Sequence, residues 1–171
     1  MYFPSLENMI PLIGIDEPLV KQLDFWLASR REAIKNYLDP LSFSQYANID
    51  YELSLDLFQV CTYEEINVLR ERFDVVIQSS NTNVGSFYNL DDIPTSHFNY
   101  DLNLEEEISS RDIVIYYELI MEPTSPPSIR SFPQEQKSTG KSYGVDITTY
   151  TESKERLNYR MGDILKQRRN G

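Results

Sequence analysis

Carboxylates make up most of the groups in this chain that could carry out acid–base or metal chemistry. Asp91, Asp92, Asp101 and Glu105–Glu107 gather within a short stretch of sequence, and divalent cations prefer oxygen ligands of this kind. Their spacing differs from that of a calcium-binding loop, and neither a catalytic base nor a phosphate-binding glycine loop accompanies them. We therefore interpret these residues as solvated surface and expect neither a metal nor a cofactor.

The single histidine and the single cysteine are weak candidates for catalysis. His97 lies in a predicted turn, where a lone histidine is more often structural than catalytic. Cys61 lies in a helical pattern with no base near it in the sequence, so we expect a buried thiol rather than a nucleophile. One cysteine also excludes a disulfide within the chain and a multi-cysteine zinc site. We predict that the protein is not an enzyme.

Size, charge and hydropathy limit the number of domains, the classes of partner and the compartment that this chain can have. The chain of 171 residues is 40% apolar and has a net charge of −11, which suits one domain and argues against binding to a phosphate backbone. It has no apolar run of about 18 residues that could span a membrane. The apolar start at 1–15 lacks a positive region and contains Pro4 and Pro11, so it is not typical of a signal peptide. Together with the lone cysteine, these features predict a cytoplasmic protein.

The charges divide the chain into an acidic body and a basic tail. Residues 1–122 contain 7 Lys and Arg against 22 Asp and Glu, whereas residues 123–171 contain 9 against 5. The boundary is the proline-rich stretch at 123–128, because proline favours extended backbone and blocks a helix. We expect a folded body followed by a linker and a flexible tail, and a tail that folds back on the acidic body also fits these charges.

The first part of the body has a helical pattern. Apolar residues at helical spacing after Asp16 predict a helix of about 20 residues, which Pro40 ends because the residue before proline avoids the helical region. A short helix at 42–47 and a third helix from Asp50 to about 65 follow. A helix, a short helix, a turn and a helix form the plan of a helix-turn-helix.

The second part of the body has the pattern of strands. Apolar and polar residues alternate over 69–77, which predicts a strand. Residues 78–85 read as a loop, and short strands are expected at 86–88 and around 98–102. The strongest strand is 113–120, which is apolar on both faces and must therefore be central or covered. The chain as a whole is predicted to be α+β.

Five segments of this body share a pattern with a known bacterial module. They are Leu41–Ala47, Tyr51–Phe58, Arg70–Val75, Tyr88–Pro94 and Asp112–Leu119. In this order they are similar to the second helix, the third helix, the wing strand, the linker between knuckles and the closing strand of that module. Residues 39–119 thus resemble a winged helix followed directly by a zinc-ribbon-like hairpin, which recurs in proteins of bacterial conflict and anti-phage defence systems.

The resemblance implies a ribbon that has lost its zinc. Intact ribbons carry two Cys-x-x-Cys knuckles, which would fall here near 79–83 and near 98–102, and neither segment contains a cysteine. Aromatic packing would then have to replace the metal. The four side chains expected to supply it are Phe87, Tyr88, Phe98 and Tyr100.

These patterns predict a division into five parts. They are an N-terminal extended arm at 1–15, a helical winged-helix domain at 16–77, a zinc-ribbon-like β segment without zinc at 78–122, a linker at 123–154 and a short basic amphipathic helix at 155–169. The sequence leaves open whether the arm packs on its own body or on a partner.

The helix expected to read DNA in such a module has the wrong charge for it. Residues 51–65 contain four carboxylates and no Lys or Arg, so phosphates would be repelled. Tyr46, Tyr51 and Tyr63 instead suit a protein interface, where tyrosine is enriched. The alternative is that these tyrosines are half-buried at the edge of the core.

The predicted C-terminal helix has one apolar stripe between basic flanks. We expect it to dock on a partner and to be ordered only when docked, although packing on its own acidic body is an alternative. Its candidate partner-binding residues are Leu157, Tyr159, Met161, Ile164 and Leu165.

We therefore expect a non-enzymatic adaptor or accessory subunit of a bacterial multiprotein complex, with protein partners and with homo-oligomers left open. The anti-phage setting comes from the resemblance alone. One alternative is a DNA-binding regulator that uses Arg70, Arg72, Arg168 and Arg169. Another is an acidic inhibitor of the antitoxin type, which the charge of residues 1–122 suggests.

Overall fold

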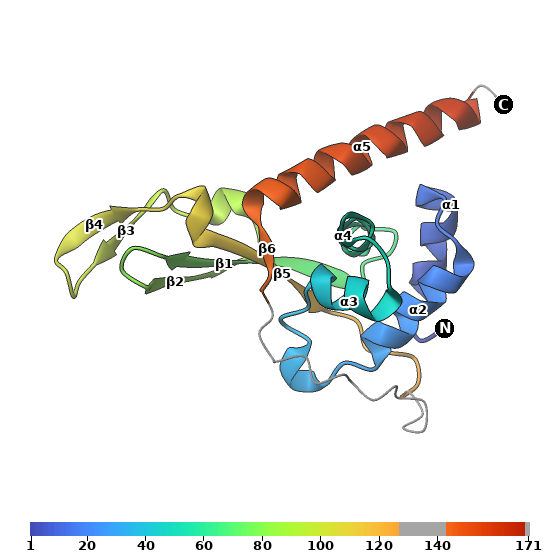
Figure 1. The fold of residues 1–171 in the computed structure, drawn as a ribbon, viewed down its shortest axis with the longest axis horizontal. Coiled ribbons are helices and arrows are strands. Elements are labelled where there is room, and N and C mark those ends of the chain that lie inside the picture. The colour runs from blue at the N-terminus through green and yellow to red at the C-terminus, as the bar shows by residue number, and fades with distance from the viewer. Residues whose placement is uncertain (127–142, 170–171) are drawn as a thin grey trace.

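The computed structural model describes residues 1–126 and 143–169, with side chains up to Asp163. The fold is α+β, as the sequence predicts. Helices lie at one end of the molecule, and a two-stranded ribbon projects at the other (Figure 1). The α-helices are α1 (Met9–Ile13), α2 (Glu17–Ala28), α3 (Pro40–Ala47), α4 (Tyr51–Val60) and α5 (Ile147–Arg169). The strands are β1 (Leu69–Ile77), β2 (Thr82–Phe87), β3 (Ser96–Asn99), β4 (Leu104–Glu107), β5 (Ile113–Leu119) and β6 (Val145–Asp146).

Four of these strands form an antiparallel sheet in the order β2-β1-β5-β6. The predicted strand at 69–77 is confirmed as β1, and it pairs with β5 from Leu69↔Leu119 to Val75↔Ile113. The strand at 113–120, predicted to be central or covered, is β5, and it lies between β1 and β6. The predicted loop at 78–85 is too long, since β2 begins at Thr82.

The core lies between one face of this sheet and the helices. Phe73 and Tyr117 point from the sheet into it and are buried. The ring of Tyr117 meets Phe58 of α4 at 5.3 Å, and the ring of Phe73 meets Tyr150 of α5 at 5.6 Å, both edge to face. Such aromatic pairs stabilise a core beyond the area that they bury.

Helix α2 is shorter than predicted. The apolar spacing continues to Leu38, but the helix ends at Ala28, where the side chains of Ser29 and Arg30 bind the carbonyl of Trp26 at 2.8 and 3.0 Å. The chain then leaves the helical path and reaches β5. There the backbones of Leu38 and Tyr117 exchange two hydrogen bonds of 2.9 and 3.0 Å. Pairing with a distant strand therefore overrides the local helical pattern.

The next two helices differ from prediction at their ends. Helix α3 begins at Pro40 rather than at 42, because the Asp39 carboxylate accepts the backbone N–H groups of Leu41 and Ser42 at 2.7 and 3.2 Å. Helix α4 ends at Val60 rather than near 65. The carbonyl of Cys61 there accepts the N–H groups of residues 68 and 69, which turns the chain into β1.

The N-terminal arm is helical and packs on its own body, which corrects the prediction of an extended arm. Residues 4–8 form a 3-10 helix that runs into α1. The Asp24 carboxylate of α2 accepts the backbone N–H groups of Tyr2 and Phe3 at 2.8 and 2.7 Å. This arm adds four fully or almost fully buried side chains to the core, namely Phe3, Leu6, Met9 and Ile13.

The C-terminal segment is part of the same core, so the predicted linker and short docking helix are wrong in their bounds. Helix α5 begins at Ile147 rather than at 155, and Val145, Tyr150 and Leu157 are buried. Gly144 has a φ of +62°, and a Cβ there would lie 2.3 Å from the Val114 side chain. Glycine therefore lets β6 approach β5 closely. Residues 127–142 of the predicted linker lie outside the described residues.

We predict that Asp24→Ala lowers the free energy of unfolding by about 1–3 kcal/mol, because two N–H groups beside buried Phe3 lose their acceptor. Urea denaturation at neutral pH measures this change. The control is Glu17→Ala on the same helix, whose carboxylate forms an exposed pair with Lys21 and should change stability much less. Equal losses in the two variants would contradict the anchoring role of Asp24.

Candidate functional site

Helix α5 covers helix α4, the helix expected to face a nucleic acid. The carboxylate of Asp56 on α4 is buried and accepts the Ser153 hydroxyl at 2.8 Å and the Arg156 guanidinium at 2.7 Å. Arg160 adds an ion pair at 3.6 Å. The side-chain amide of Gln59 donates to the Tyr150 carbonyl at 3.1 Å. These contacts fasten the C-terminal helix to α4.

The covered helix offers little surface to a ligand. Every residue from 54 to 60 is buried, whereas a recognition helix needs exposed side chains that reach base edges. Glu52, in the first turn of α4, has a side chain that is 77% exposed, but its negative charge repels phosphate. With α5 in place, α4 presents few exposed side chains to a nucleic acid.

The predicted partner-binding residues of the tail are only partly available. Leu157 is fully buried in the protein's own core, so the stripe packs in cis at this position. Tyr159 is 74% exposed and Met161 is half-buried. The side chains of Ile164, Leu165, Arg168 and Arg169 lie outside the described residues, although their backbone belongs to α5.

The three predicted interface tyrosines are not equivalent. Tyr51 and Tyr63 are half-buried and pack against the core, as the alternative interpretation expects. Burial, together with the nearby Asp39 and Asp146, raises the pKa of Tyr51 to about 12. Tyr46 remains 40% exposed, with its ring against Phe43. The structure therefore leaves Tyr46 as the most accessible of the three.

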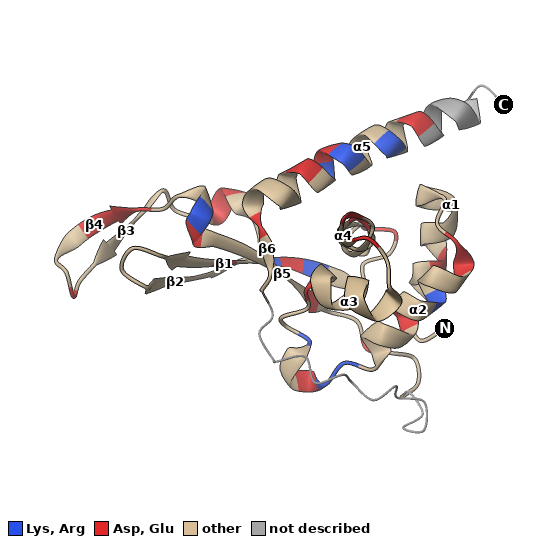
Figure 2. Ribbon diagram, viewed as in Figure 1, with Lys and Arg blue, Asp and Glu red and all other residues tan. Residues whose placement is uncertain are grey.

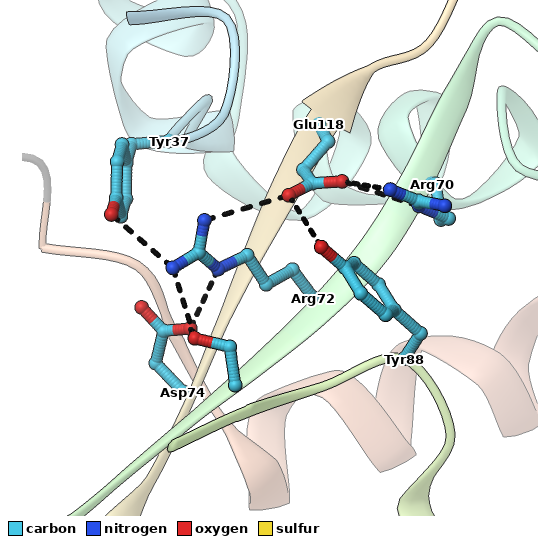
Figure 3. A network of polar contacts seen from close by, with 7 residues as sticks. Tyr37, Arg70, Arg72, Asp74, Tyr88 and Glu118 are labelled. Carbon is cyan, nitrogen blue, oxygen red and sulfur yellow. Dashed lines mark hydrogen bonds and ion pairs between the residues drawn. The ribbon is translucent and has the colours of Figure 1, made fainter. Parts of the chain in front are cut away.

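A network of charged side chains occupies the sheet face that looks away from α4 and α5 (Figure 3). Arg70 and Glu118 are direct partners across β1 and β5, and the Arg70 guanidinium donates to the buried Glu118 carboxylate at 2.6 Å. The same carboxylate accepts the Tyr88 hydroxyl at 3.2 Å and lies 3.5 Å from Arg72. The guanidinium of Arg70 also lies 3.9 Å from the centre of the Tyr88 ring.

Arg72 is more enclosed than Arg70. Its guanidinium donates to Asp74 at 2.7 Å, to Ser86 at 2.9 Å and to the Tyr37 hydroxyl at 3.2 Å, and its side chain is 15% exposed. Burial lowers the pKa of Arg72, but the hydrogen bond and charge of Asp74 outweigh it and raise the pKa above its ordinary value. The arginine is therefore charged and already neutralised by carboxylates.

These pairings bear on the DNA-binding alternative. A guanidinium contributes to phosphate binding when it can release counterions from the nucleic acid. Arg70 and Arg72 would have to leave Glu118 and Asp74 first, and a buried carboxylate would then lose its partners, which is costly. Arg70 and Arg72 therefore stabilise the sheet and are poorly placed to hold a phosphate backbone.

The two segments predicted as zinc knuckles lie next to each other and are joined by polar contacts. The side-chain amide of buried Asn99 donates to Thr82 and to Glu106, both at 2.9 Å. The Ser80 hydroxyl donates to the same Glu106 carboxylate at 2.9 Å. These hydrogen bonds lower the pKa of Glu106, with Asn99 making the largest contribution. The ribbon is thus held to the sheet by hydrogen bonds.

The predicted aromatic replacement for zinc is wrong. Phe98, Tyr100 and Tyr88 are exposed, and only Phe87 packs against the core. Polar side chains at the knuckle positions satisfy one another, so the ribbon does not need an aromatic core of its own. Sequence patterns missed this because Ser, Thr and Asn in loops are common and carry no pairing information.

The described residues show little that resembles a catalytic centre. Within them, no three His, Cys, Asp or Glu side chains are grouped so as to hold a metal ion. The Cys61 thiol is fully buried, and burial raises its pKa. A hollow of about 370 Å³ lies beside Met1 and Lys21, but the Asp24 carboxylate that lines it is already bound to backbone N–H groups. No helix in the described part of the chain is long and apolar enough to span a membrane.

Comparisons with protein-family models, with curated proteins and with solved structures found no match to this chain. Three features stand out in the described part of the chain. They are a helix covered by α5, an arginine network whose charges are paired with carboxylates, and an exposed acidic ribbon.

We predict that Asp56→Ala loosens α5 and lowers the free energy of unfolding by about 1–3 kcal/mol, because Ser153 and Arg156 lose a buried acceptor. Limited proteolysis should then cleave within α5 sooner than in the unchanged protein. Glu52→Ala is the matched control, since Glu52 lies on the same helix 3.8 Å from the same arginine but is exposed. If protease cleaved both variants at the rate of the unchanged protein, Asp56 would not be holding α5 on α4.

The network on the outer sheet face gives a second prediction. Glu118→Ala should lower the free energy of unfolding by about 1–3 kcal/mol, because Arg70, Arg72 and Tyr88 lose a buried acceptor. Glu122→Ala serves as the control, since its carboxylate is 81% exposed beside Lys35. Thermal unfolding with both variants measures the difference, and similar midpoints would show that the network contributes nothing.

Proposed function

We propose that this protein is a non-enzymatic adaptor or accessory subunit of a bacterial multiprotein complex. The observation that carries the proposal is the sealing of α4 by α5 through Asp56, which removes the surface that a DNA-reading protein of this plan would use. The self-neutralised Arg70 and Arg72 support the same conclusion. The anti-phage setting rests on the family resemblance alone.

The order of elements supports a winged helix-turn-helix as the framework of this adaptor. Helices α3 and α4 are joined by residues 48–50, and Asn48 ends α3 in the left-handed conformation with a φ of 52°. Strands β1 and β5 follow as an antiparallel pair. The segment between them, with β2, β3 and β4, would then be an enlarged wing.

Charge and compartment agree with a protein partner. Residues 1–122 carry 22 acidic against 7 basic side chains, so the body repels nucleic acids. We place the protein in the cytoplasm because its one cysteine, Cys61, is free and buried. Exposed aromatic and aliphatic side chains elsewhere on the body suit an interface.

Affinity purification of the tagged full chain from its native host, with nuclease treatment, tests the proposal. We expect a stoichiometric protein partner that survives the nuclease. In parallel, the purified chain should not retard duplex DNA even at about 50 mM salt, where phosphate contacts are strongest.

Recovery of nucleic acid alone, or loss of the partner on nuclease treatment, would favour the DNA-binding regulator and contradict the adaptor. Recovery of a single basic enzyme whose activity the protein blocks would favour the acidic inhibitor instead.

A further inference from the structure

The ribbon formed by β3 and β4 exposes an unusual set of apolar side chains. It projects from the sheet at the end of the molecule opposite the helices (Figure 1). Tyr100 is 84% exposed, Leu102 55%, Leu104 45% and Phe98 40%. Apolar groups gathered in this way on a soluble surface commonly mark a contact with another molecule.

Specific hydrogen bonds hold these side chains in their exposed positions. The side-chain oxygen of buried Asn99 accepts the backbone N–H groups of Asp101 and Leu102 at 3.0 and 3.2 Å, which shapes the turn. Asn103 completes the turn with a φ of 52°. The rings of Phe98 and Tyr100 lie 4.9 Å apart, edge to face. Because the turn is already ordered, binding through it costs less conformational entropy.

The charge around these side chains has one sign. Residues 89–110 contain six carboxylates and no Lys or Arg, and Figure 2 shows the acidic colour along β4. Glu105 is the direct cross-strand partner of Phe98, so both lie on the same face of the ribbon. Glu105 and Glu107 are exposed, whereas Glu106 turns toward Ser80 and Thr82.

The negative charge of the ribbon limits which class of molecule can bind to it. Nucleic acids and anionic membranes would be repelled by the carboxylates. A protein surface with an apolar centre and a rim of Lys and Arg complements both the apolar and the acidic groups.

We propose that the β3–β4 ribbon is the docking element for a basic partner protein. Tyr100, Phe98 and Leu102 enter an apolar depression on that partner, and Asp101, Glu105 and Glu107 face its basic rim. The inference rests on the proposed adaptor function and names the chemistry of the partner that the adaptor binds.

Variants of the full chain test this proposal. The double variant Tyr100→Ser with Leu102→Ser removes the apolar anchors. The double variant Glu105→Lys with Glu107→Lys reverses the charge of the acidic side chains beside them. Tyr143→Ser is the matched control, because Tyr143 is 69% exposed and lies outside the ribbon. Circular dichroism and thermal unfolding confirm that each variant is folded. The partner recovered with the unchanged protein is purified, and its affinity for each variant is measured by calorimetry.

We expect each ribbon variant to weaken binding by about tenfold or more and the control to leave it unchanged. The affinity of the unchanged protein should also fall between about 50 and 200 mM salt, because opposite charges meet at the rim. A photo-crosslinker at position 100 should label a partner peptide whose surroundings are rich in Lys and Arg.

The other outcomes separate the two proposals. If the unchanged protein recovers no protein partner, the adaptor function fails and the ribbon inference fails with it. If a partner is recovered and both ribbon variants bind it as tightly as the control, the ribbon inference alone is overturned. Crosslinking to a second copy of this chain would overturn it in favour of self-association.

Discussion

The buried carboxylate of Asp56 is the contact on which the arrangement of this protein depends. Removing a charge from water is costly, and the cost is offset here by the Ser153 hydroxyl, by Arg156 and by Arg160. All three come from α5, so the carboxylate is satisfied only when the C-terminal helix is in place. The same placement brings Tyr150 and Leu157 into the core. One polar contact therefore couples the end of the chain to its centre.

The sheet separates two kinds of surface. Its inner face packs Phe73 and Tyr117 against α4 and α5, whereas its outer face balances Arg70 and Arg72 against Glu118 and Asp74. In this outer network Glu118 and Asp74 lie close together, and each has a guanidinium beside it. Few charges remain available on this face for an external ligand.

The ribbon differs from the sheet, because most of its apolar and acidic side chains are exposed rather than paired or buried. Its apolar side chains are exposed, and residues 89–110, which contain it, have six carboxylates and no Lys or Arg. Its polar side chains at the base, Asn99 and Glu106, are used to hold the backbone in position. An ordered support that presents exposed apolar and acidic groups suits a docking element. The proposed adaptor would combine a closed body with one exposed projection.

The sequence by itself determined the features that depend on local pattern. These are the α+β class, the strands at 69–77 and 113–120 and the acidic character of the body. Alternation and β-branched runs report which faces of a strand are buried, so they can be recognised without a partner. They do not report which residues cover those faces.

Only the tertiary structure decided what lies opposite each element. The end of α2 depends on pairing between Leu38 and Tyr117, and the position of α5 depends on Asp56, which is about 100 residues away from its partners. Local periodicity contains no information about contacts at such separation. For the same reason, the sequence could not show that Arg70 faces Glu118 or that Leu157 is buried in the protein's own core.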